Sequence, residues 1–305
     1  MSTRHGHNAR TSGVLLVALS ATCFAAMAVF ARAMYADGGD PNTLLLLRFT
    51  LAAVVLVPLA ARRAAPRPRG ATLGGLVLLG ALYVCQSLSY FSALTMTSAA
   101  LLGLLLYVYP VVVAVLASVL FRIPLTRPRI VSLALAVAGA ALTIGPLGSG
   151  NWLGIGLGLA SALIYAGYIL VATRITRRVD PVWSSAIITA SAALIFGVLA
   201  LAHGVALPAS PIGWAAVGAI ALVSTVVAIL SFLAGLARLG PTDAATISTL
   251  EPAMTALLAV LLLGESLGPM QLVGGALIVS AALLIARSAA PPWERLTVSP
   301  SGHTG

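Results

Sequence analysis

The sequence contains no lysine and few charged residues of any kind. Only 8% of its 305 residues are charged, whereas 60% are hydrophobic and the mean hydropathy is +1.07. Soluble domains carry about 25% charged residues, because a folded chain must cover its surface with polar groups. The shortage of charge therefore argues against a soluble enzyme, a nucleic-acid-binding module or a disordered chain, and it indicates an integral membrane protein.

Cysteine and histidine are also scarce. The two cysteines, Cys23 and Cys85, lie in apolar runs and do not suggest a disulfide framework. No spacing of Cys, His or Asp is typical of a metal site, and no Ser-His-Asp order suggests hydrolysis. The run Gly154-x-Gly156-x-Gly158 lacks the lysine of a phosphate loop. We therefore expect no metal, no cofactor and no catalytic residue in this chain.

Ten apolar segments follow one another along the chain, separated by Gly, Pro and Arg. A helix that crosses the hydrocarbon core needs about 20 apolar residues, and each segment is close to that length. The first uncharged run, over 11–31, is too long for the apolar part of a signal peptide, so we expect a retained helix. The sequence predicts an all-α integral membrane protein with ten transmembrane helices, at about 13–35, 42–61, 71–92, 98–120, 128–146, 152–173, 182–202, 211–236, 242–263 and 269–287.

The arginines predict the orientation of these helices. If the N-terminus is cytoplasmic, 15 of the 17 arginines fall on the cytoplasmic side, and the other two, Arg32 and Arg48, lie within spans. The opposite loops hold Asp37, Asp40 and Glu265 instead. Because basic residues favour cytoplasmic loops, we expect both termini in the cytoplasm and the protein in the cell (inner) membrane.

The sequence also contains an internal repeat. When Leu105–Leu120 is overlaid on Ile247–Leu262, Pro110 falls on Pro252. This overlay shifts the sequence by 142 residues, and a second overlay with a shift of 141 residues places Phe24 on Tyr165. Since each half then has five spans, an odd number, the second half must be inverted relative to the first. We expect a cytoplasmic tail at 1–12, five-helix repeats at 13–146 and 152–287, and a disordered cytoplasmic tail at 288–305.

Several short motifs resemble the EamA-type transporters of the drug/metabolite transporter superfamily. The second half carries Arg238-Leu-Gly-Pro-Thr-Asp, Leu250-Glu251-Pro252, Leu263-Gly264-Glu265 and Gln271-Leu-Val-Gly274-Gly275. The first half keeps Pro110, and Arg48-Phe49 is similar to the family's Arg-Phe, but Arg122-Ile123 stands in place of the Gly-Glu pair. The resemblance implies a ten-helix transporter with a central cavity, commonly an exporter of amino acids, related metabolites or drugs.

Glu251 is the most unusual residue of the ninth segment. It lies nine residues into a helix that begins near Thr242, or about 14 Å, and therefore near the middle of a hydrocarbon core about 30 Å thick. A charge at this depth must face the helix bundle or a water-filled cavity. Glu251 is therefore a candidate partner for a substrate amine or a candidate proton carrier, and a structural ion pair is the alternative.

Arg48 and two prolines are further candidates. Arg48 keeps its charge in practice, so it must bind a substrate carboxylate, pair with Glu251 or donate to helix carbonyls. Pro110 and Pro252 each remove a helical hydrogen bond and free the carbonyl four residues earlier, at Leu106 and Ser248. Breaks at matching points of two inverted halves favour a transport site, and a simple packing kink is the alternative.

Polar and aromatic residues gather in the third and fourth segments. Tyr83, Gln86 and Tyr90 follow helical spacing and share one face, which suits a cavity wall. We add Tyr109 and Ser224 as candidate substrate-contact residues. The alternative for each is contact between helices.

These patterns together favour a secondary transporter that works by alternating access, and the family resemblance implies export of a small amphipathic metabolite. An uptake permease or a passive channel is the alternative, and an integral-membrane enzyme fits less well because the acidic and histidine residues do not cluster. The expected partners are a small-molecule substrate and the lipid bilayer, with no nucleic acid. A homodimer stays open, because a GxxxG face such as that of Gly154 and Gly158 also serves packing within one chain.

Overall fold

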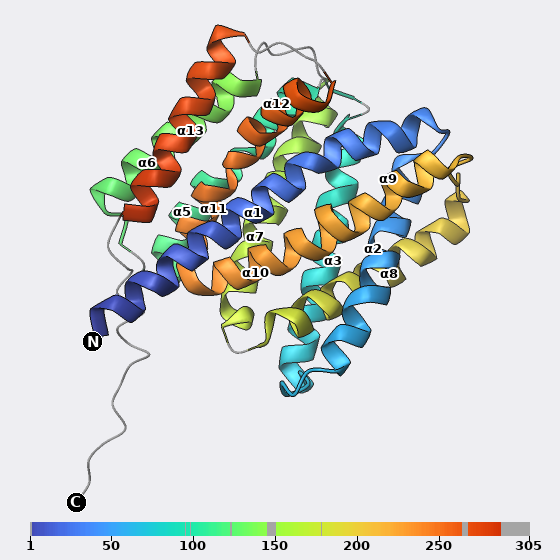
Figure 1. Cartoon of the computed structure of the whole chain (residues 1–305), viewed down its shortest axis with the longest axis horizontal. Coiled ribbons are helices and arrows are strands. Elements are labelled where there is room, and N and C mark those ends of the chain that lie inside the picture. Colours follow the sequence, from blue (N-terminus) through green and yellow to red (C-terminus); the bar gives the residue numbers. More distant parts are fainter. Residues whose placement is uncertain are drawn as a thin grey trace, which may run out of the picture.

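The computed structural model describes residues 2–94, 96–97, 99–122, 124–144, 151–177, 179–263 and 268–287. Within these ranges every secondary-structure element longer than one residue is a helix (Figure 1). The expected disordered tail at 288–305 and Glu265 lie outside the described residues. The helical class of the fold is thus confirmed.

The elements of the first half are helices throughout. Their bounds are α1 Ser2–Ala36, α2 Pro41–Ala61, α3 Gly70–Leu94, α4 Ala99–Leu106, α5 Tyr109–Leu120 and α6 Arg127–Ile144. Those of the second half are α7 Trp152–Thr176, α8 Pro181–His203, α9 Pro211–Ala221, the π-helix η1 Leu222–Val227, α10 Ala228–Leu239, α11 Pro241–Ser248, α12 Leu250–Leu263 and α13 Pro269–Arg287.

Eight helical runs in the described part are long and apolar enough to cross a membrane. They are Arg10–Ala36, Pro41–Ala61, Gly70–Ala93, Leu101–Leu120, Trp152–Thr176, Pro181–Ala202, Pro211–Leu239 and Pro269–Arg287. The other two expected spans coincide with α6 and with the broken pair α11 and α12, which are helical but are not among the eight. The count of ten therefore stays a prediction.

The expected tail at 1–12 is largely helical, because α1 already begins at Ser2. Adding residues to an existing helix costs far less than starting a new one, so the apolar part of α1 extends into the polar residues before it. The part that is apolar enough to cross a membrane begins at Arg10.

Several helices begin at a proline that follows a capping side chain. Asp40, Asp180 and Ser210 each accept hydrogen bonds from backbone N–H groups of the next helix, and a proline is the first helical residue in all three cases. Proline suits this position because its missing N–H needs no partner there. These caps explain why the apolar runs become helices at the residues where they do.

The helices pack through small residues. A Cβ atom on Gly139 of α6 would lie 2.7 Å from the carbonyl oxygen of Gly274 in α13, so these two helices approach closely (Figure 1). Gly154 and Gly158 of α7 lie against Thr97 and Leu105, near and in α4. The GxxxG face of α7 therefore packs within the chain.

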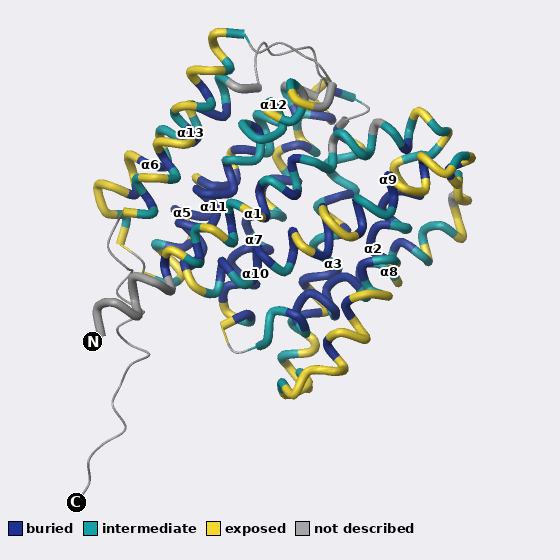
Figure 2. The backbone as a smooth tube through the Cα atoms, viewed as in Figure 1, coloured by how far each residue is buried: buried dark blue, intermediate teal, exposed yellow. Residues whose placement is uncertain are grey.

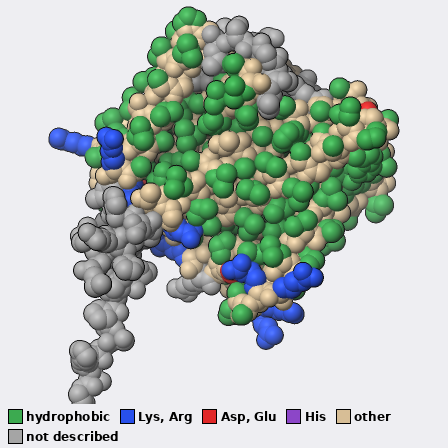
Figure 3. All heavy atoms as spheres, in the orientation of Figure 1, with side chains coloured by type: hydrophobic (Ala, Val, Ile, Leu, Met, Phe, Trp, Pro, Cys, Tyr) green, Lys and Arg blue, Asp and Glu red, His purple; other side chains and the backbone are tan. Residues whose placement is uncertain are grey.

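The outer surface is apolar in its middle and basic at one end. Figure 2 shows α7, α10 and α11 largely buried in the centre, while α2, α8, α6 and α13 at the periphery contain many exposed residues. In Figure 3 hydrophobic side chains cover most of this face, and basic side chains gather along its left and lower edges. We call the end where α1 begins the arginine-rich end, and the opposite end, which holds Asp37 and Asp40, the arginine-poor end.

Candidate functional site

A cavity of about 130 Å³ lies among the helices of both halves. Six of the seven side chains predicted to contact substrate line it, namely Arg48, Tyr83, Gln86, Tyr90, Tyr109 and Glu251. The remaining lining residues are Phe24, Met27, Ser87, Phe91, Leu106, Tyr107 and Tyr165. The structure thus brings candidates from several different helices to one place.

The cavity belongs to the arginine-poor half of the molecule. In α3 its lining residues begin at Tyr83 and end at Phe91, near the last residue of the helix, Leu94. In α1 the first lining residue, Phe24, comes 14 residues after Arg10, or about 21 Å along the helix. Arg48 is in the first half of α2, which begins at the arginine-poor end.

Arg48 is buried beside the cavity and is held by neutral groups. Its side chain is 3% exposed. Its Nε donates to the Thr225 hydroxyl over 2.8 Å, one terminal nitrogen donates to the Tyr83 hydroxyl over 3.0 Å, and the other contacts the Met27 sulfur at 3.0 Å. The guanidinium carbon also lies 4.9 Å from the centre of the Phe49 ring. These contacts fix the guanidinium in place without neutralising its charge.

A π-helix places the Thr225 hydroxyl against Arg48. In η1 the hydrogen-bonding step lengthens to five residues, and the Thr225 hydroxyl donates to the Ile220 carbonyl, five residues earlier, over 2.9 Å. The adjacent Ser224 does not line the cavity. It is fully buried, and its hydroxyl has no hydrogen-bond partner in the described structure. The prediction that Ser224 contacts substrate is therefore not supported by its position.

Glu251 lines the cavity from the first turn of α12. The Tyr107 side chain lies within hydrogen-bonding reach of its carboxyl group, and Arg48 interacts with it electrostatically. Arg48 directs its own hydrogen bonds to Thr225 and Tyr83 rather than to Glu251. The two charges therefore share the cavity without forming a direct ion pair.

Two helix breaks border the cavity. The helix before Pro110 ends at Leu106, and the helix before Pro252 ends at Ser248, which are the residues whose carbonyls the prolines are expected to free. Leu106 and Tyr107 line the cavity at the first break, and Glu251 follows directly after the second. Both prolines are buried.

A continuous series of ring contacts runs beside these groups, and its members Tyr83, Tyr165, Tyr109 and Tyr107 form an aromatic wall of the cavity. Phe196 stacks on Phe49 and Phe49 meets Tyr83 edge to face, with ring centres 5.7 Å and 5.3 Å apart. The chain of contacts continues through Tyr168 and Tyr165 to Tyr109 and Tyr107. Aromatic faces attract cations and apolar groups alike, so this wall suits an amphipathic solute.

Polar contacts also hold the wall in position. Gln86 donates to the Ser161 hydroxyl over 3.1 Å, and this contact joins α3 to α7. The Tyr109 hydroxyl donates to the Ala245 carbonyl over 3.4 Å, and this contact joins α5 to α11. Gln86 and Tyr109 thus both line the cavity and connect the two halves of the chain.

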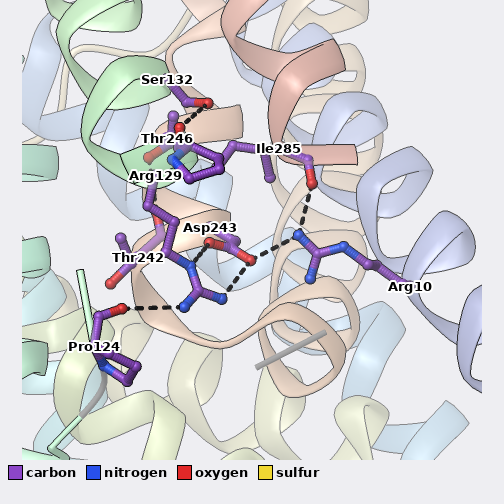
Figure 4. Close-up of polar contacts among 9 residues, drawn as sticks. Arg10, Pro124, Arg129, Ser132, Thr242, Asp243, Thr246 and Ile285 are labelled. Atoms are coloured by element: carbon purple, nitrogen blue, oxygen red, sulfur yellow. Dashed lines mark hydrogen bonds and ion pairs between the residues drawn. The ribbon is translucent and has the colours of Figure 1, made fainter. Parts of the chain in front are cut away.

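A second group of buried charges lies at the arginine-rich end. Arg10 and Arg129 approach Asp243 from two sides, with nitrogen to oxygen distances of 2.9 Å in both ion pairs (Figure 4). The three side chains are 3%, 3% and 1% exposed. We call Arg10, Asp243 and Arg129 the charged triad. No sequence pattern singled it out, although a buried helix-start aspartate facing two arginines is as unusual in a membrane protein as Glu251.

The described residues hold no group of three or more His, Cys, Asp or Glu side chains that could bind a metal ion. The chemical groups of the cavity are one guanidinium, one carboxyl, an amide, hydroxyls and aromatic rings. Such a set binds and orients a charged, partly apolar molecule.

The chain is similar over most of its length to several known proteins. The chain is 28% identical over 279 residues to the uncharacterized transporter YcbK of Bacillus subtilis, covering 86% of this chain and 89% of that protein. It is 28% identical over 277 residues to an uncharacterized transporter of Archaeoglobus fulgidus, covering 89% and 95%. A solved crystal structure shares the fold, with a TM-score of 0.77 at 19% identity, covering 90% of this chain and 96% of the other.

A family model also matches the chain twice. The model of the EamA-like transporter family matches residues 11–145 and again residues 152–287, so each half of the sequence carries one copy. With its apolar helices, two matched repeats and transporter relatives, this chain is a multi-pass membrane protein that belongs to the EamA-like transporter family, within the drug/metabolite transporter superfamily.

Proposed function

We propose that this protein is a secondary transporter that exports a small amphipathic metabolite by alternating access through the cavity. The observation that carries the proposal is the buried Arg48 guanidinium, which borders the cavity and whose hydrogen-bond partners among the described residues are all neutral. A buried cation of this kind is stabilised when an anion enters the cavity. A solute carboxylate that binds both terminal nitrogens is the natural ligand.

The size and lining of the cavity indicate the class of solute. A buried water needs about 10–15 Å³ of such space, so 130 Å³ holds roughly ten waters or a solute of about ten non-hydrogen atoms. Arg48 would bind a carboxylate, Glu251 an amine or a proton, and the tyrosine wall an apolar or aromatic side chain. An amino acid or a related compound fits all three features.

The repeat relationship supports two inverted halves around the cavity. The overlay that places Pro110 on Pro252 also places Tyr109 on Glu251, and both of these residues line the cavity. The overlay that places Phe24 on Tyr165 likewise pairs two lining residues. A cavity lined by equivalent residues of two inverted repeats lies near their symmetry axis, where transporters of this design bind substrate.

The distribution of arginines supports a placement of the protein in the membrane. We propose ten spans, with α6 and the pair α11 and α12 completing the eight that meet the length requirement. The arginine-rich end then faces the cytoplasm, with both termini, in the cell membrane. The cavity consequently lies in the outer half of the protein.

The test is a comparison of small molecules in the medium of cells that overproduce the native protein or the Glu251→Ala variant at equal membrane abundance. We expect one class of amphipathic solute to accumulate outside only with the native protein. Asp180→Asn is the matched control, because asparagine caps a helix as well as aspartate does and Asp180 lies outside the cavity. Identical media would overturn export of any abundant metabolite.

Reconstituted vesicles then separate the remaining functions. Accumulation inside cells rather than outside indicates an uptake permease. Flux that saturates and accelerates when unlabelled solute is present on the far side identifies a carrier, whereas flux without this counterflow identifies a passive channel.

A further inference from the structure

We propose that the charged triad is a latch that holds the arginine-rich end of the transporter closed, and that it must separate each time the cavity opens toward that end. The proposal rests on the proposed function, because a transporter that works by alternating access needs a closed and an open state at each end. Four observations support it: the helices that the triad joins, its position, its incomplete hydrogen bonding and the uncharged residues that replace it in the repeat.

The triad joins the two halves of the chain. Arg10 is in α1 and Arg129 in α6, which belong to the first half, whereas Asp243 is in α11 of the second half. Arg10 also donates to the Ile285 carbonyl of α13 over 2.6 Å. Figure 4 shows the two guanidinium groups meeting the Asp243 carboxylate between these helices. Any movement of one half against the other at this end must stretch these bonds.

The triad lies between the cavity and the arginine-rich end. Asp243 is in the first turn of α11, eight residues or about 12 Å before the cavity residue Glu251. Ala244 and Ala245, which follow Asp243, are fully buried. The cavity is therefore separated from the arginine-rich end by packed helix and by the triad.

The hydrogen bonding of the triad is incomplete. Arg10 in particular uses only part of its hydrogen-bonding capacity. Two nitrogens of Arg10, Nε and Nη1, are buried and have no hydrogen-bond partner in the described structure, and the same holds for the Thr242 hydroxyl. Water would satisfy these donors once the helices separate. The ion pairs therefore stabilise the closed state, and the unsatisfied donors destabilise it. A contact that opens in every transport cycle requires such a balance, because its closed state must not be too stable.

The equivalent positions of the repeat are uncharged. The two overlays of the halves place Arg10 on Asn151, Arg129 on Gln271 and Asp243 on Leu101. Asn151 and Gln271 accept hydrogen bonds from the backbone of their own helix starts, at Gly154 and Gly268. The two ends of a symmetric design therefore differ, and the difference favours a resting state that is closed at the arginine-rich end.

The experiment measures access of water-soluble thiol reagents to two reporter positions. Both native cysteines are first replaced, as Cys23→Ser and Cys85→Ser. Ala245→Cys then reports on the packed region between triad and cavity, and Ser87→Cys reports on the cavity itself. A membrane-impermeant maleimide is added separately to the two faces of oriented membrane vesicles, and the labelling rate of each reporter is measured.

We expect Asp243→Asn to raise labelling of the Ala245→Cys reporter from the arginine-rich face by about tenfold, because loss of the ion pairs shifts the population toward the state open at that face. Labelling of the Ser87→Cys reporter from the opposite face should fall in parallel. Arg129→Gln keeps the ion pair between Arg10 and Asp243, so it should change both labelling rates in the same direction but by a smaller factor. If Asp243→Asn does not fold, this milder variant provides the test.

Asp180→Asn is the matched control. It removes an ion pair with Arg63 at the same end, but Arg63 is 49% exposed and Asp180 is outside the triad. We expect Asp180→Asn to leave the labelling rates of both reporters unchanged. Equal labelling of the Ala245→Cys reporter in Asp243→Asn, Arg129→Gln and native backgrounds would overturn the latch. Failure of the Ser87→Cys reporter to react from either face would instead contradict the proposed function, so the two failures are distinct.

Discussion

The charged triad and the cavity hold buried charges in opposite ways. In the triad both guanidinium groups contact the same carboxylate at 2.9 Å. In the cavity Arg48 is bonded to Thr225 and Tyr83, and the carboxyl group of Glu251 lies apart from it. Charges in direct contact hold helices together, whereas charges held apart by neutral groups stay available to a ligand. The same residue types thus stabilise one region and keep the other ready to bind.

The largest expected effect is on stability and concerns the triad. Asp243→Ala removes the carboxylate that two buried guanidinium groups contact, so we expect the free energy of unfolding to fall by about 3–5 kcal/mol. Glu251→Ala removes a carboxyl that lacks a direct ion pair and should cost only about 1 kcal/mol. Unfolding in detergent, followed by circular dichroism, checks both values. Similar losses of unfolding free energy in the two variants would contradict the distinction between charges in direct contact and charges held apart.

The second prediction concerns transport, for which we expect Glu251 to matter more than Asp243. Glu251→Gln keeps the shape of the side chain but cannot carry a proton. We expect uphill export to fall at least about tenfold while exchange of labelled for unlabelled solute persists in reconstituted vesicles. Equal loss of export and exchange would show that Glu251 binds the solute rather than a proton.

A smaller effect is expected from the group that positions Arg48. Thr225→Val removes the acceptor of the Arg48 Nε bond, and a hydrogen bond to a charged group is worth about 1.5–3 kcal/mol. We expect KM for a carboxylate-bearing solute to rise about tenfold with little change in kcat, and Thr225→Ser to restore it. Ser224→Ala, one residue away and without a bond to Arg48, should change KM less than about twofold.

The smallest effect lies outside both regions, at the start of α2. Burial raises the pKa of Asp40, but hydrogen bonds from the Thr43 hydroxyl and from the backbone of Thr43 and Asn42 outweigh it, so the pKa lies below its ordinary value. A lowered pKa adds stability that is complete above about pH 5 and is lost as the pH falls through the folded-state pKa.

Asp40→Asn isolates this contribution. It should keep the cap and remove the pH dependence, as melting temperatures between about pH 6 and pH 3 will show. An unchanged pH profile in this variant would mean that another carboxylate controls acid stability. Since Asp40 lies far from the triad and the cavity, transport at neutral pH should be unaffected.

Local rules predicted the break points and most of the cavity. A proline frees the carbonyl four residues earlier whatever surrounds it, so Leu106 and Ser248 follow from the sequence alone. Likewise, the helical spacing of Tyr83, Gln86 and Tyr90 places them on one face, and all three line the cavity. These features depend on residues within one or two helical turns.

Features that depend on distant residues or irregular helices were missed. Asp243 meets partners 114 and 233 residues away, and no local pattern indicates such pairs. Ser224 was proposed as a substrate contact, but it does not line the cavity, and the π-helix at Leu222–Val227 places the neighbouring Thr225 against Arg48. Both features depend on three-dimensional context rather than on residue chemistry.

The sequence separation within the triad also has a consequence for synthesis in the cell. Asp243 is added 233 residues after Arg10, which at about 5–20 residues per second is a delay of roughly 10–50 s. During this time Arg10 of α1 waits for the α11 carboxylate, and Arg129 of α6 joins it for the last 114 residues. A chain cut short before Asp243 lacks the carboxylate that both arginines contact, so the triad distinguishes a polypeptide that has passed this residue from one that stopped before it.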